Sequence, residues 1–548
     1  MKATVWTALS IAVSFGFAAA IAAPSATRPV VTIVQGALAG QVDAQGILSF
    51  KGIPYAAPPV GNKRWTAPIA AAGWRGVRDA SHFGAACIQP PWPKQAVYND
   101  NIPKGSEDCL FLNVWAPAHA NKAPVIVWIY GGGLVFGSTW EPYYNGRNFA
   151  AHGVVFVSMN YRLGVLGWLA LPALSAESPH GVSGNYGLLD QIEALKWVKK
   201  NIAVFGGDPN NVTIMGESAG GLSVAYLLAS PLARGLFQKA IGESLGIYSE
   251  PELKRADHGL PSAEAIGVRI EKAVGAPNLK ALRTMDAAKL NMAALMAGFR
   301  PTGTIDGWTL PHQLVDTYDR KQEAHVPVLM GFNAGEIETL PQFLPPLPSS
   351  SEVYASEIRK RYRDLAPAFL RLYPASNVKA SMMAAERDAI FGWGAERIVR
   401  DEAALGEPSY LYFFDHGYPA ARAVGLRAFH ASEIPYVFGW VGERLVQNWP
   451  PPQGPKEKAL SDAMISYWIS FARTGVPKAP GEPGWPTFAP NKSYMHFAAK
   501  PEVSTGLMPG MYKLNEEVME RRRRAGNQQW GADVGVAAPV LPSPAATR

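Results

Sequence analysis

Residues 212–220 read Val-Thr-Ile-Met-Gly-Glu-Ser-Ala-Gly, and this stretch indicates both a fold class and a reactive group. Residues 212–215 have the continuous apolar character of a buried strand, and a helical pattern follows through Leu228. Between them lies G-x-S-x-G, a strand–turn–helix motif that lifts a serine hydroxyl clear of a sheet. The small neighbours let the backbone bend sharply at Ser218. Ser218 is therefore a candidate nucleophile, and a serine that only caps the helix is the alternative.

The same alternation of strand and helix patterns extends along most of the chain, which is typical of a mostly parallel sheet covered on both faces by helices. Before residue 124, short strands with many Gly/Pro turns indicate antiparallel edge strands. Residues 231–326 show no strong strand, and we interpret them as an insertion over one end of the sheet. The expected strands are residues 30–34, 125–130, 154–158, 212–215, 326–331 and 410–414, and the expected helices are residues 188–201, 219–228, 262–274, 352–370, 382–405 and 457–471.

A second motif, Gly131-Gly132-Gly133, directly follows the expected strand at residues 125–130. Three glycines let the backbone approach a ligand closely, and in a sheet of this kind such a loop supplies N–H donors to an oxyanion. A phosphate-binding loop is disfavoured because no Gly-Lys-Ser/Thr follows. A plain tight turn is the remaining alternative.

A reactive serine needs a base, and the base needs an acid that orients it. In this architecture the order along the chain is serine, acid, histidine. Glu336 follows the expected strand at residues 326–331 and is better placed than Glu338, Asp316 or Asp319. Both His416 and His430 follow the strand at residues 410–414, so spacing alone does not choose between them, and His496 lies near the tail.

Composition excludes several classes of protein. The chain has 548 residues, 48% of them hydrophobic and 17% charged, so it is too apolar to be disordered and long enough to bury a large core. Without Lys2 and the run Arg521–Arg524, the net charge of +7 becomes 46 basic against 44 acidic residues. We interpret the arginine run as the solvated end of a helix, and binding of nucleic acid or an anionic surface is the alternative.

Residues 1–22 have the pattern of a secretory signal. Lys2 precedes an apolar stretch, and Ala20-Ile21-Ala22 offers a cleavage site with small residues. An uncleaved membrane anchor is the alternative. We expect an exported protein, periplasmic or secreted, that is not held in a membrane after cleavage. It would consist of a single α/β domain over residues 23–524 and a disordered Pro/Ala/Gly-rich tail over residues 525–548.

Cys87 and Cys109 are the only cysteines and lie 22 positions apart. In an oxidising compartment they can close a loop, which loop entropy makes worth about 3 kcal/mol. A lone cysteine pair is a poor metal site, and the chain has no HExxH motif. We therefore expect no metal.

Longer motifs around these residues resemble a known family. Residues 205–220 are similar throughout to the serine signature of the type-B carboxylesterases, the cholinesterase-like branch of the α/β-hydrolases. Residues 107–117 are similar to a second signature of that family, and residues 160–164 and 185–191 are similar to further blocks. The resemblance covers roughly residues 30–515. It implies the α/β-hydrolase fold, with a large, mostly parallel central sheet, flanking helices and insertions covering the active-site end.

The resemblance also implies a role for each candidate. Ser218 would be the nucleophile, Glu336 the acid and His430, rather than His416, the base. For Glu217, implied to be a buried acid beside the nucleophile, a purely structural carboxylate is the alternative. The other implied features are an oxyanion hole from Gly132, Gly133 and Ala219, a disulfide between Cys87 and Cys109, and a supporting serine at Ser244.

Two positions depart from the family pattern. The family usually has Gln-Ser-Gly where this chain has Glu243-Ser244-Leu245, so we expect altered surroundings for Ser244. Asn99, with Tyr98 beside it, occupies the position of the choline-binding tryptophan of family cholinesterases. A cation–π cage, and with it cholinesterase activity, is therefore disfavoured.

These residues together predict a serine carboxylic ester hydrolase that acts on a small-molecule ester through an acyl-enzyme and needs no cofactor. We expect no nucleic-acid partner, and the sequence indicates no oligomeric state. An acyltransferase or amidase that uses the same acyl-enzyme is one alternative. The other is a non-catalytic binding protein on the same fold.

Overall fold

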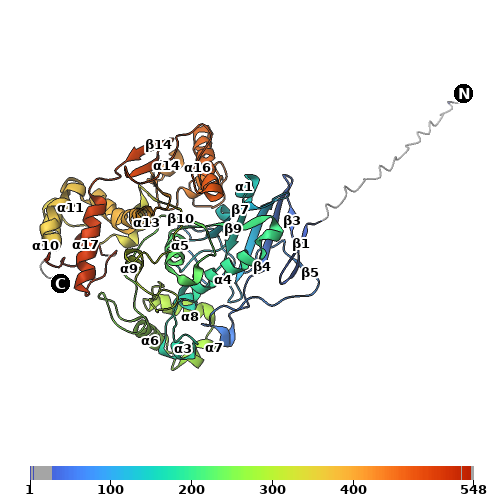
Figure 1. The fold of residues 1–548 in the computed structure, drawn as a ribbon, viewed down its shortest axis with the longest axis horizontal. Coiled ribbons are helices and arrows are strands. Elements are labelled where there is room, and N and C mark those ends of the chain that lie inside the picture. Colours follow the sequence, from blue (N-terminus) through green and yellow to red (C-terminus); the bar gives the residue numbers. More distant parts are fainter. Residues whose placement is uncertain (2–3, 5–27, 532, 545–548) are drawn as a thin grey trace.

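The structure, a computed structural model, describes residues 1, 4, 28–531 and 533–544 (Figure 1). Within these residues, eleven strands form one central sheet and three form a small separate sheet. In sheet order the eleven are β14 (Pro501–Thr505), β13 (Ser493–Phe497), β12 (Ser409–Phe414), β11 (Val328–Asn333), β10 (Lys239–Glu243), β9 (Gly207–Glu217), β7 (Ala123–Ile129), β8 (Val155–Met159), β6 (Phe111–Pro117), β4 (Ile47–Pro54) and β3 (Gln41–Val42), and the small sheet contains β1 (Val30–Ile33), β2 (Gly36–Ala39) and β5 (Val77–Asp79).

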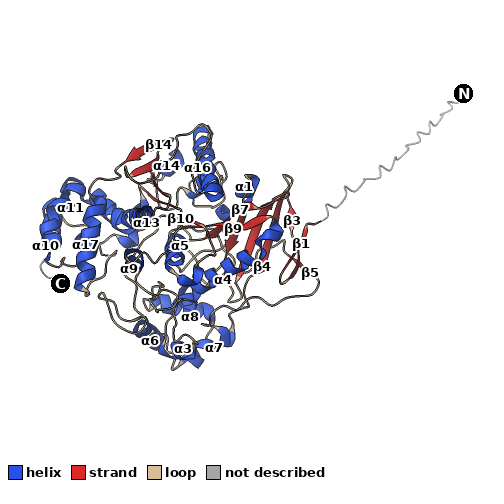
Figure 2. Ribbon diagram, in the orientation of Figure 1, coloured by secondary structure: helices blue, strands red, loops and turns tan. Residues whose placement is uncertain are grey.

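Helices cover both faces of the central sheet, with α16 against one face and α4 and α5 against the other (Figure 2). The helices are α1 (Arg147–Ala151), α2 (Gly164–Trp168), α3 (Pro172–Glu177), α4 (Tyr186–Asn201), α5 (Ala219–Ala229), α6 (Ala263–Ala273), α7 (Leu279–Thr284), α8 (Ala287–Met296), α9 (Leu314–Asp319), α10 (Ser351–Tyr362), α11 (Ala366–Leu372), α12 (Val378–Arg387), α13 (Trp393–Ala404), α14 (Pro419–Ala423), α15 (Ile434–Val437), α16 (Pro455–Thr474) and α17 (Met511–Ala525).

The centre of the sheet is parallel, as predicted. Strands β8, β7, β9, β10, β11, β12 and β13 pair in parallel in that order. Every residue of β7 and β8 is buried, because helices cover the sheet on both sides. Strands β3, β4, β6 and β8 pair antiparallel, which confirms the predicted antiparallel edge. The carboxyl ends of β9, β11 and β12 therefore meet at one edge, where the candidate side chains follow them.

The interpretation of residues 231–326 as an insertion without a strand was wrong in one respect. Strand β10, Lys239–Glu243, lies in this segment and pairs between β9 and β11, with all five residues buried. Its sequence, Lys-Ala-Ile-Gly-Glu, has charged ends and few large apolar residues, so it lacks the apolar run of a buried strand. The ends are accommodated by polar contacts: Nζ of Lys239 donates to Asn211, and Trp468 donates to Glu243.

Of the two long helices predicted from periodicity, the first is interrupted and the second is continuous but contains a π-helical turn. Arg363, with a φ of 49°, separates α10 from α11, and a π-helical turn at residues 388–392 lies between α12 and α13. Pro367 then stands in the first turn of α11, a position that proline tolerates. Neither feature has a signal in the apolar spacing of the sequence, which is why periodicity alone joined the segments.

The described residues of the tail are ordered, in contrast to the prediction for residues 525–548. Trp530 is fully buried, and Leu541 is 1% exposed. The N–H of Leu541 donates to the carbonyl of Arg361 at 2.8 Å, and the guanidinium of Arg361 donates to the carbonyl of Ala538 at 2.6 Å. A few large apolar side chains anchor the segment. The prediction of disorder rested on its overall Pro/Ala/Gly-rich composition, in which these few side chains carry little weight.

The run Arg521–Arg524 ends α17, but it is not simply a solvated helix end. Arg521 and Arg522 are buried, and Arg521 pairs with Asp364 and Glu517. Arg523 pairs with Asp316, Asp319 and Glu520. Most of these acidic partners are distant in sequence. The sequence alone therefore indicates an exposed basic run, whereas in the fold the acids lie against the arginines.

The predicted secretory signal lies almost entirely outside the described residues. Among the helices of the described part of the chain, none is both long and apolar enough to cross a membrane.

Candidate active site

Ser218 lies in the sharp turn between β9 and α5. Its φ of 57° and ψ of −121° are strained for a residue with a side chain, as a G-x-S-x-G turn requires. A Cβ built on Gly220 would lie 2.0 Å from the carbonyl oxygen of Ile129, so only glycine fits against β7 there. The N–H of Ser218 donates to the carbonyl of Glu243 at 2.9 Å. Backbone contacts to both neighbouring strands therefore fix the serine.

His430 and Glu336 meet Ser218 from two other loops. Nε2 of His430 lies 2.8 Å from Oγ of Ser218, and Nδ1 lies 2.5 Å from Oε2 of Glu336. Oε1 of Glu336 accepts the N–H of Asn333 at 2.7 Å. His430 is therefore within hydrogen-bond distance of both Ser218 and Glu336. Its Nε2 can take the serine proton while Nδ1 donates to the carboxylate.

A short backbone bridge explains how the two loops are joined. The loop after β11 carries Glu336 and the loop after β12 carries His430. Gly335 forms an isolated bridge with Phe429, and its N–H donates to the carbonyl of Ala428 at 2.7 Å. The acid and the histidine, 94 positions apart, are therefore held by adjacent main chain.

The other candidates from the sequence lie elsewhere. Nε2 of His416 is 2.6 Å from Oε2 of Glu457, and His496 lies 3.6 Å from Asp415. Glu338 pairs with Arg427 at 2.8 Å. Asp316 and Asp319 pair with Arg523. Of these candidates, His430 is the histidine that contacts Ser218, and Glu336 is the acid that contacts Nδ1 of His430. Spacing in the sequence left the histidine undecided.

The glycine loop after β7 lies against Ser218. A Cβ built on Gly131 would be 3.0 Å from Cβ of Ser218, and Gly132 and Gly133 have positive φ values of 93° and 63°. Ala219 is the first residue of α5, so its N–H has no partner within the helix. Among the described residues, no hydrogen bond is formed by the N–H groups of Gly132, Gly133 or Ala219. These three donors are free to receive an oxyanion.

Glu217 is a second buried acid beside the imidazole. Its Oε1 lies 3.1 Å from Nε2 of His430, yet it has no hydrogen-bond partner among the described residues, because Nε2 is directed at Ser218. Burial raises the pKa of Glu217 well above its ordinary value, and the neighbouring carboxylate of Glu336 raises it further. Both effects favour the protonated, neutral form of Glu217.

Two more buried acids, to which the sequence analysis gave no role of their own, lie near this pair. Glu433 accepts from Nδ2 of Asn333, and burial, followed by the charges of Glu217 and Glu336, raises its pKa to about 8. Glu243 accepts from Nε1 of Trp468 at 2.6 Å, and burial raises its pKa as well. The sequence signals were the position of Glu433 three residues after His430 and, for Glu243, an acid in place of the glutamine that the family usually has before Ser244.

Ser244 follows β10, and its altered surroundings stay a prediction. It has a positive φ of 50°, and its N–H donates to the carbonyl of Gly331 at 2.8 Å. Its buried Oγ has no hydrogen-bond partner among the described residues. The backbone of Ser244 is therefore bonded to β11, and its hydroxyl forms no hydrogen bond with Ser218, His430 or Glu336.

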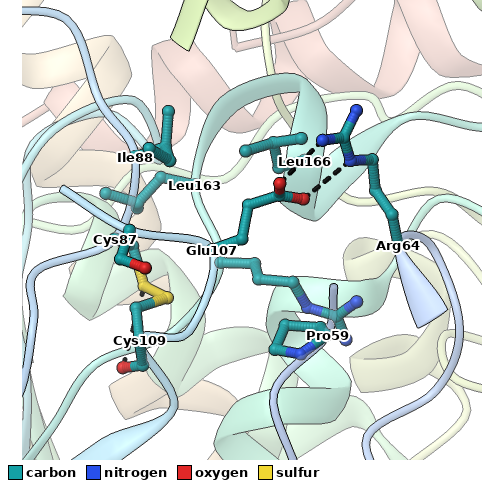
Figure 3. A pocket seen from close by; sticks show the side chains of 10 residues that line it. Pro59, Arg64, Cys87, Ile88, Glu107, Cys109, Leu163 and Leu166 are labelled. Carbon is teal, nitrogen blue, oxygen red and sulfur yellow. Dashed lines mark hydrogen bonds and ion pairs between the residues drawn. A yellow bond between two sulfur atoms is a disulfide. The ribbon is translucent and has the colours of Figure 1, made fainter. Parts of the chain in front are cut away.

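Cys87 and Cys109 form a disulfide (Figure 3). Close to it, Arg64 and Glu107 form a two-pronged ion pair with both N–O distances at 2.6 Å. The disulfide closes a loop that contains Trp92 and Tyr98, and both side chains pack near the site. Within the described residues, no group of three or more His, Cys, Asp or Glu side chains is arranged to hold a metal ion.

Comparison with known proteins decides the family. The family model described as "Carboxylesterase family" matches residues 27–515. The chain belongs to the carboxylesterase family. It is 39% identical to a fumonisin B1 esterase of Sphingopyxis macrogoltabida over 84% of this chain and 85% of that protein. It is 36% identical to a para-nitrobenzyl esterase of Bacillus subtilis over 84% of this chain and 93% of that protein.

Solved structures agree with the sequence relatives. A structure of a PNB esterase covers 89% of this chain and 99% of its own, with a TM-score of 0.77 at 31% identity. A carboxylesterase of Geobacillus stearothermophilus covers 89% of this chain and 100% of its own, with a TM-score of 0.73 at 32% identity. The predicted α/β-hydrolase fold is confirmed, and the chain is a carboxylic ester hydrolase.

Proposed function

We propose that this carboxylesterase cleaves its ester by two-step acyl transfer through Ser218, His430 and Glu336. His430 accepts the serine proton at Nε2 as Oγ attacks the ester carbonyl, and then gives the proton to the leaving alcohol. Glu336 keeps the other ring nitrogen protonated and stabilises the imidazolium. Water then attacks the acyl-enzyme by the same route. The observation that carries the proposal is the continuous contact from Oγ of Ser218 through His430 to Glu336.

The oxyanion of each step is assigned to the N–H groups of Gly132, Gly133 and Ala219. Their lack of other partners among the described residues supports this assignment. The N–H of Ala219 also lies at the N-terminus of α5, where the helix dipole favours negative charge. Loss of a single donor of this kind costs about 10²–10³ in rate.

The residues need no cofactor for this chemistry, since the serine supplies the nucleophile and the histidine moves the proton. We propose a single domain that also includes the described tail residues, 525–531 and 533–544, and export to the periplasm or medium, which the disulfide supports because such bonds persist in oxidising compartments. We propose no nucleic-acid partner, because Arg521 and Arg523 are engaged in ion pairs within the chain.

The test uses p-nitrophenyl and p-nitrobenzyl esters with Ser218→Ala and a matched pair of histidine variants. We expect Ser218→Ala to lower kcat by about 10⁴–10⁶. We expect His430→Ala to be similarly inactive, while His416→Ala, a histidine from the same strand end, retains activity. Folding of each variant is checked by circular dichroism. Activity retained in Ser218→Ala, or equal losses in the two histidine variants, would refute the assignment.

Product analysis in the same assay separates hydrolysis from acyl transfer. With methanol or glycerol added, a hydrolase releases mainly the free acid, and a transferase forms mainly the new ester. An anilide of the same acyl group tests amide cleavage. We expect the free acid to be the main product because water reaches Ser218, which is partly exposed.

A further inference from the structure

The disulfide loop from Cys87 to Cys109 contacts both sides of the active site. On one side, Nε2 of Gln89 donates to the carbonyl of Gly137 at 2.9 Å, and the N–H of Gly137 donates back to Oε1 of Gln89 at 3.0 Å. Gly137 lies four residues after Gly133, and the preceding residue, Phe136, donates its N–H to the carbonyl of Gly132 in the glycine loop. The disulfide loop is therefore attached to the segment that carries the oxyanion donors.

An aromatic stack strengthens this attachment. The rings of Trp92 and Phe136 stack at 4.0 Å with an interplanar angle of 18°. The ring of Tyr98 lies 5.8 Å from that of Trp92 and 5.9 Å from that of Trp449. Tyr98 thus continues the aromatic contact from the glycine loop to the segment that follows His430.

The Tyr98 hydroxyl joins the loops that carry the base and the acid. It donates to the carbonyl oxygen of His430 at 2.9 Å and lies 2.7 Å from Oγ1 of Thr339. Thr339 ends the short helical turn that begins with Glu336. One phenol therefore bridges the main chain of the base to the turn of the acid. Burial raises the pKa of Tyr98 well above its ordinary value, so the hydroxyl keeps its proton and remains a donor.

A second contact ties the same loops together without a titratable group. Nδ2 of Asn448 donates to the carbonyl of Lys94 at 2.6 Å and to that of Ala96 at 3.0 Å. Both carbonyls belong to the disulfide loop. The loop is consequently fixed to the segment after His430 by two residues, of which only Tyr98 contacts His430 itself.

We propose that Tyr98 is a positioning residue that sets the orientation of His430 relative to Glu336, and that the Cys87–Cys109 loop holds Tyr98 in place for this task. The proposal rests on the proposed roles of Ser218, His430 and Glu336. Tyr98 touches neither the serine nor a ring nitrogen of His430; it acts through the main-chain carbonyl. Since a misplacement of about 1 Å can cost about 10²-fold in rate, a fixed main chain at the base has a direct effect on kcat.

The first experiment compares Tyr98→Phe with Tyr354→Phe. Tyr354 is a matched control, because its buried hydroxyl also donates to a main-chain carbonyl, that of Tyr373 at 3.0 Å, but in α10 and away from the site. With p-nitrophenyl esters, we expect kcat of Tyr98→Phe to fall about 10-fold to 100-fold with KM within about twofold. Tyr354→Phe should leave kcat unchanged, although both substitutions lower Tm.

Equal kcat values for the two tyrosine variants, or a loss confined to KM, would overturn the proposal. Ser218→Ala, measured alongside, keeps the two proposals apart. If Ser218→Ala is active, the proposed mechanism fails; if it is inactive while Tyr98→Phe behaves as Tyr354→Phe does, only the positioning role fails.

A second experiment removes the disulfide in both backgrounds. We expect the pair Cys87→Ala and Cys109→Ala to lower kcat severalfold in the otherwise wild-type chain. In the Tyr98→Phe background it should lower kcat little further, because residues that act through one contact are not additive. Thr339→Val, which keeps the phenol ring in place, provides a milder test if Tyr98→Phe folds poorly. Additive losses throughout would contradict transmission through Tyr98.

Discussion

At the scale of single residues, the site has two buried acids on opposite sides of one imidazole. Glu336 contacts Nδ1 of His430, and Glu217 lies 3.1 Å from Nε2. The raised pKa of Glu217 favours its neutral form, in which the imidazolium that forms during reaction faces the charge of Glu336 alone. A second ionised carboxylate beside Nε2 would compete with Ser218 for the imidazole.

This difference predicts unequal effects for the same substitution at the two acids. Glu336→Gln should lower kcat by about 10⁴, the loss seen when the acid of such a chain becomes an amide. Glu217→Gln replaces a protonated acid with a neutral side chain of similar shape, so kcat should change by no more than about fivefold. Steady-state kinetics at pH 7 distinguish the two cases. A loss of 10³ or more in Glu217→Gln would show that Glu217 acts as a charged group.

Sequence reasoning reached the residues that carry the chemistry but not all of those that hold them. Ser218 was found from its motif, and Glu336 from its position after a strand. His430 and His416 could not be distinguished by spacing, because both follow β12 and only the fold directs one of them at Ser218. Tyr98 could not be found at all, since its contact with His430 spans 332 positions.

At the scale of elements, helix α5 is joined to the segment after β10 by a buried acid. Glu250 accepts hydrogen bonds from the hydroxyls of Tyr226, on α5, and Thr302. Its backbone is held by the side-chain amide of Gln313. Burial raises the pKa of Glu250 to about 7, despite these donors. The junction therefore changes charge near neutral pH.

A pH dependence of stability follows from the sign of this shift. Between the ordinary pKa of 4.5 and about 7, unfolded chains lose the proton that folded chains keep, so stability falls as pH rises. At pH 8 this shift lowers the free energy of unfolding by about 3 kcal/mol relative to low pH. Glu250→Gln removes it, so we expect its Tm relative to that of the wild type to increase from pH 5 to pH 8. A difference in Tm that stays constant with pH would argue against titration of Glu250.

The elements show what patterning can and cannot predict. The central strands were predicted because β7, β8 and β11 are mostly apolar, as burial of every residue on both faces favours. Strand β10 was missed because it has charged residues at both ends. Hydrogen bonds with Asn211 and Trp468, which are distant in sequence, offset the cost of burying these ends. The helix break at Arg363 and the π-helical turn at residues 388–392 have no signal in the apolar spacing of the sequence.

At the scale of the whole molecule, segments that are separate in sequence are held together by contacts between their side chains. Arg162, in the block at residues 160–164, forms a buried ion pair with Asp190, in the block at residues 185–191, at 2.7 Å. The tail packs in the same way against distant residues. Trp530 is fully buried, with its ring against that of His258 and its carbonyl accepting the N–H of Ser249, and the N–H of Leu541 donates to Arg361 in α10. Sequence composition cannot reveal such pairings, because it averages over position.

The tail should therefore contribute to the stability of the molecule. A chain that ends at residue 525 loses the burial of Trp530, Val534 and Leu541, worth at least about 3 kcal/mol. We expect a Tm several degrees lower, measured by differential scanning calorimetry, and faster proteolysis. A chain that ends at residue 544 keeps these side chains and serves as the control. Equal Tm values for the two truncations would contradict a structural role for the tail.

The glycines around Ser218 have a consequence for how this enzyme can diversify. Gly220 lets the nucleophile turn touch the main chain of β7, and Glu243 binds the serine N–H through its carbonyl rather than its side chain. The reacting hydroxyl is thus located by three adjacent strands whose peptide groups do not change when side chains do. Random mutagenesis of the surrounding loops should accordingly alter which esters are accepted far more readily than it abolishes turnover, a favourable starting point for laboratory evolution.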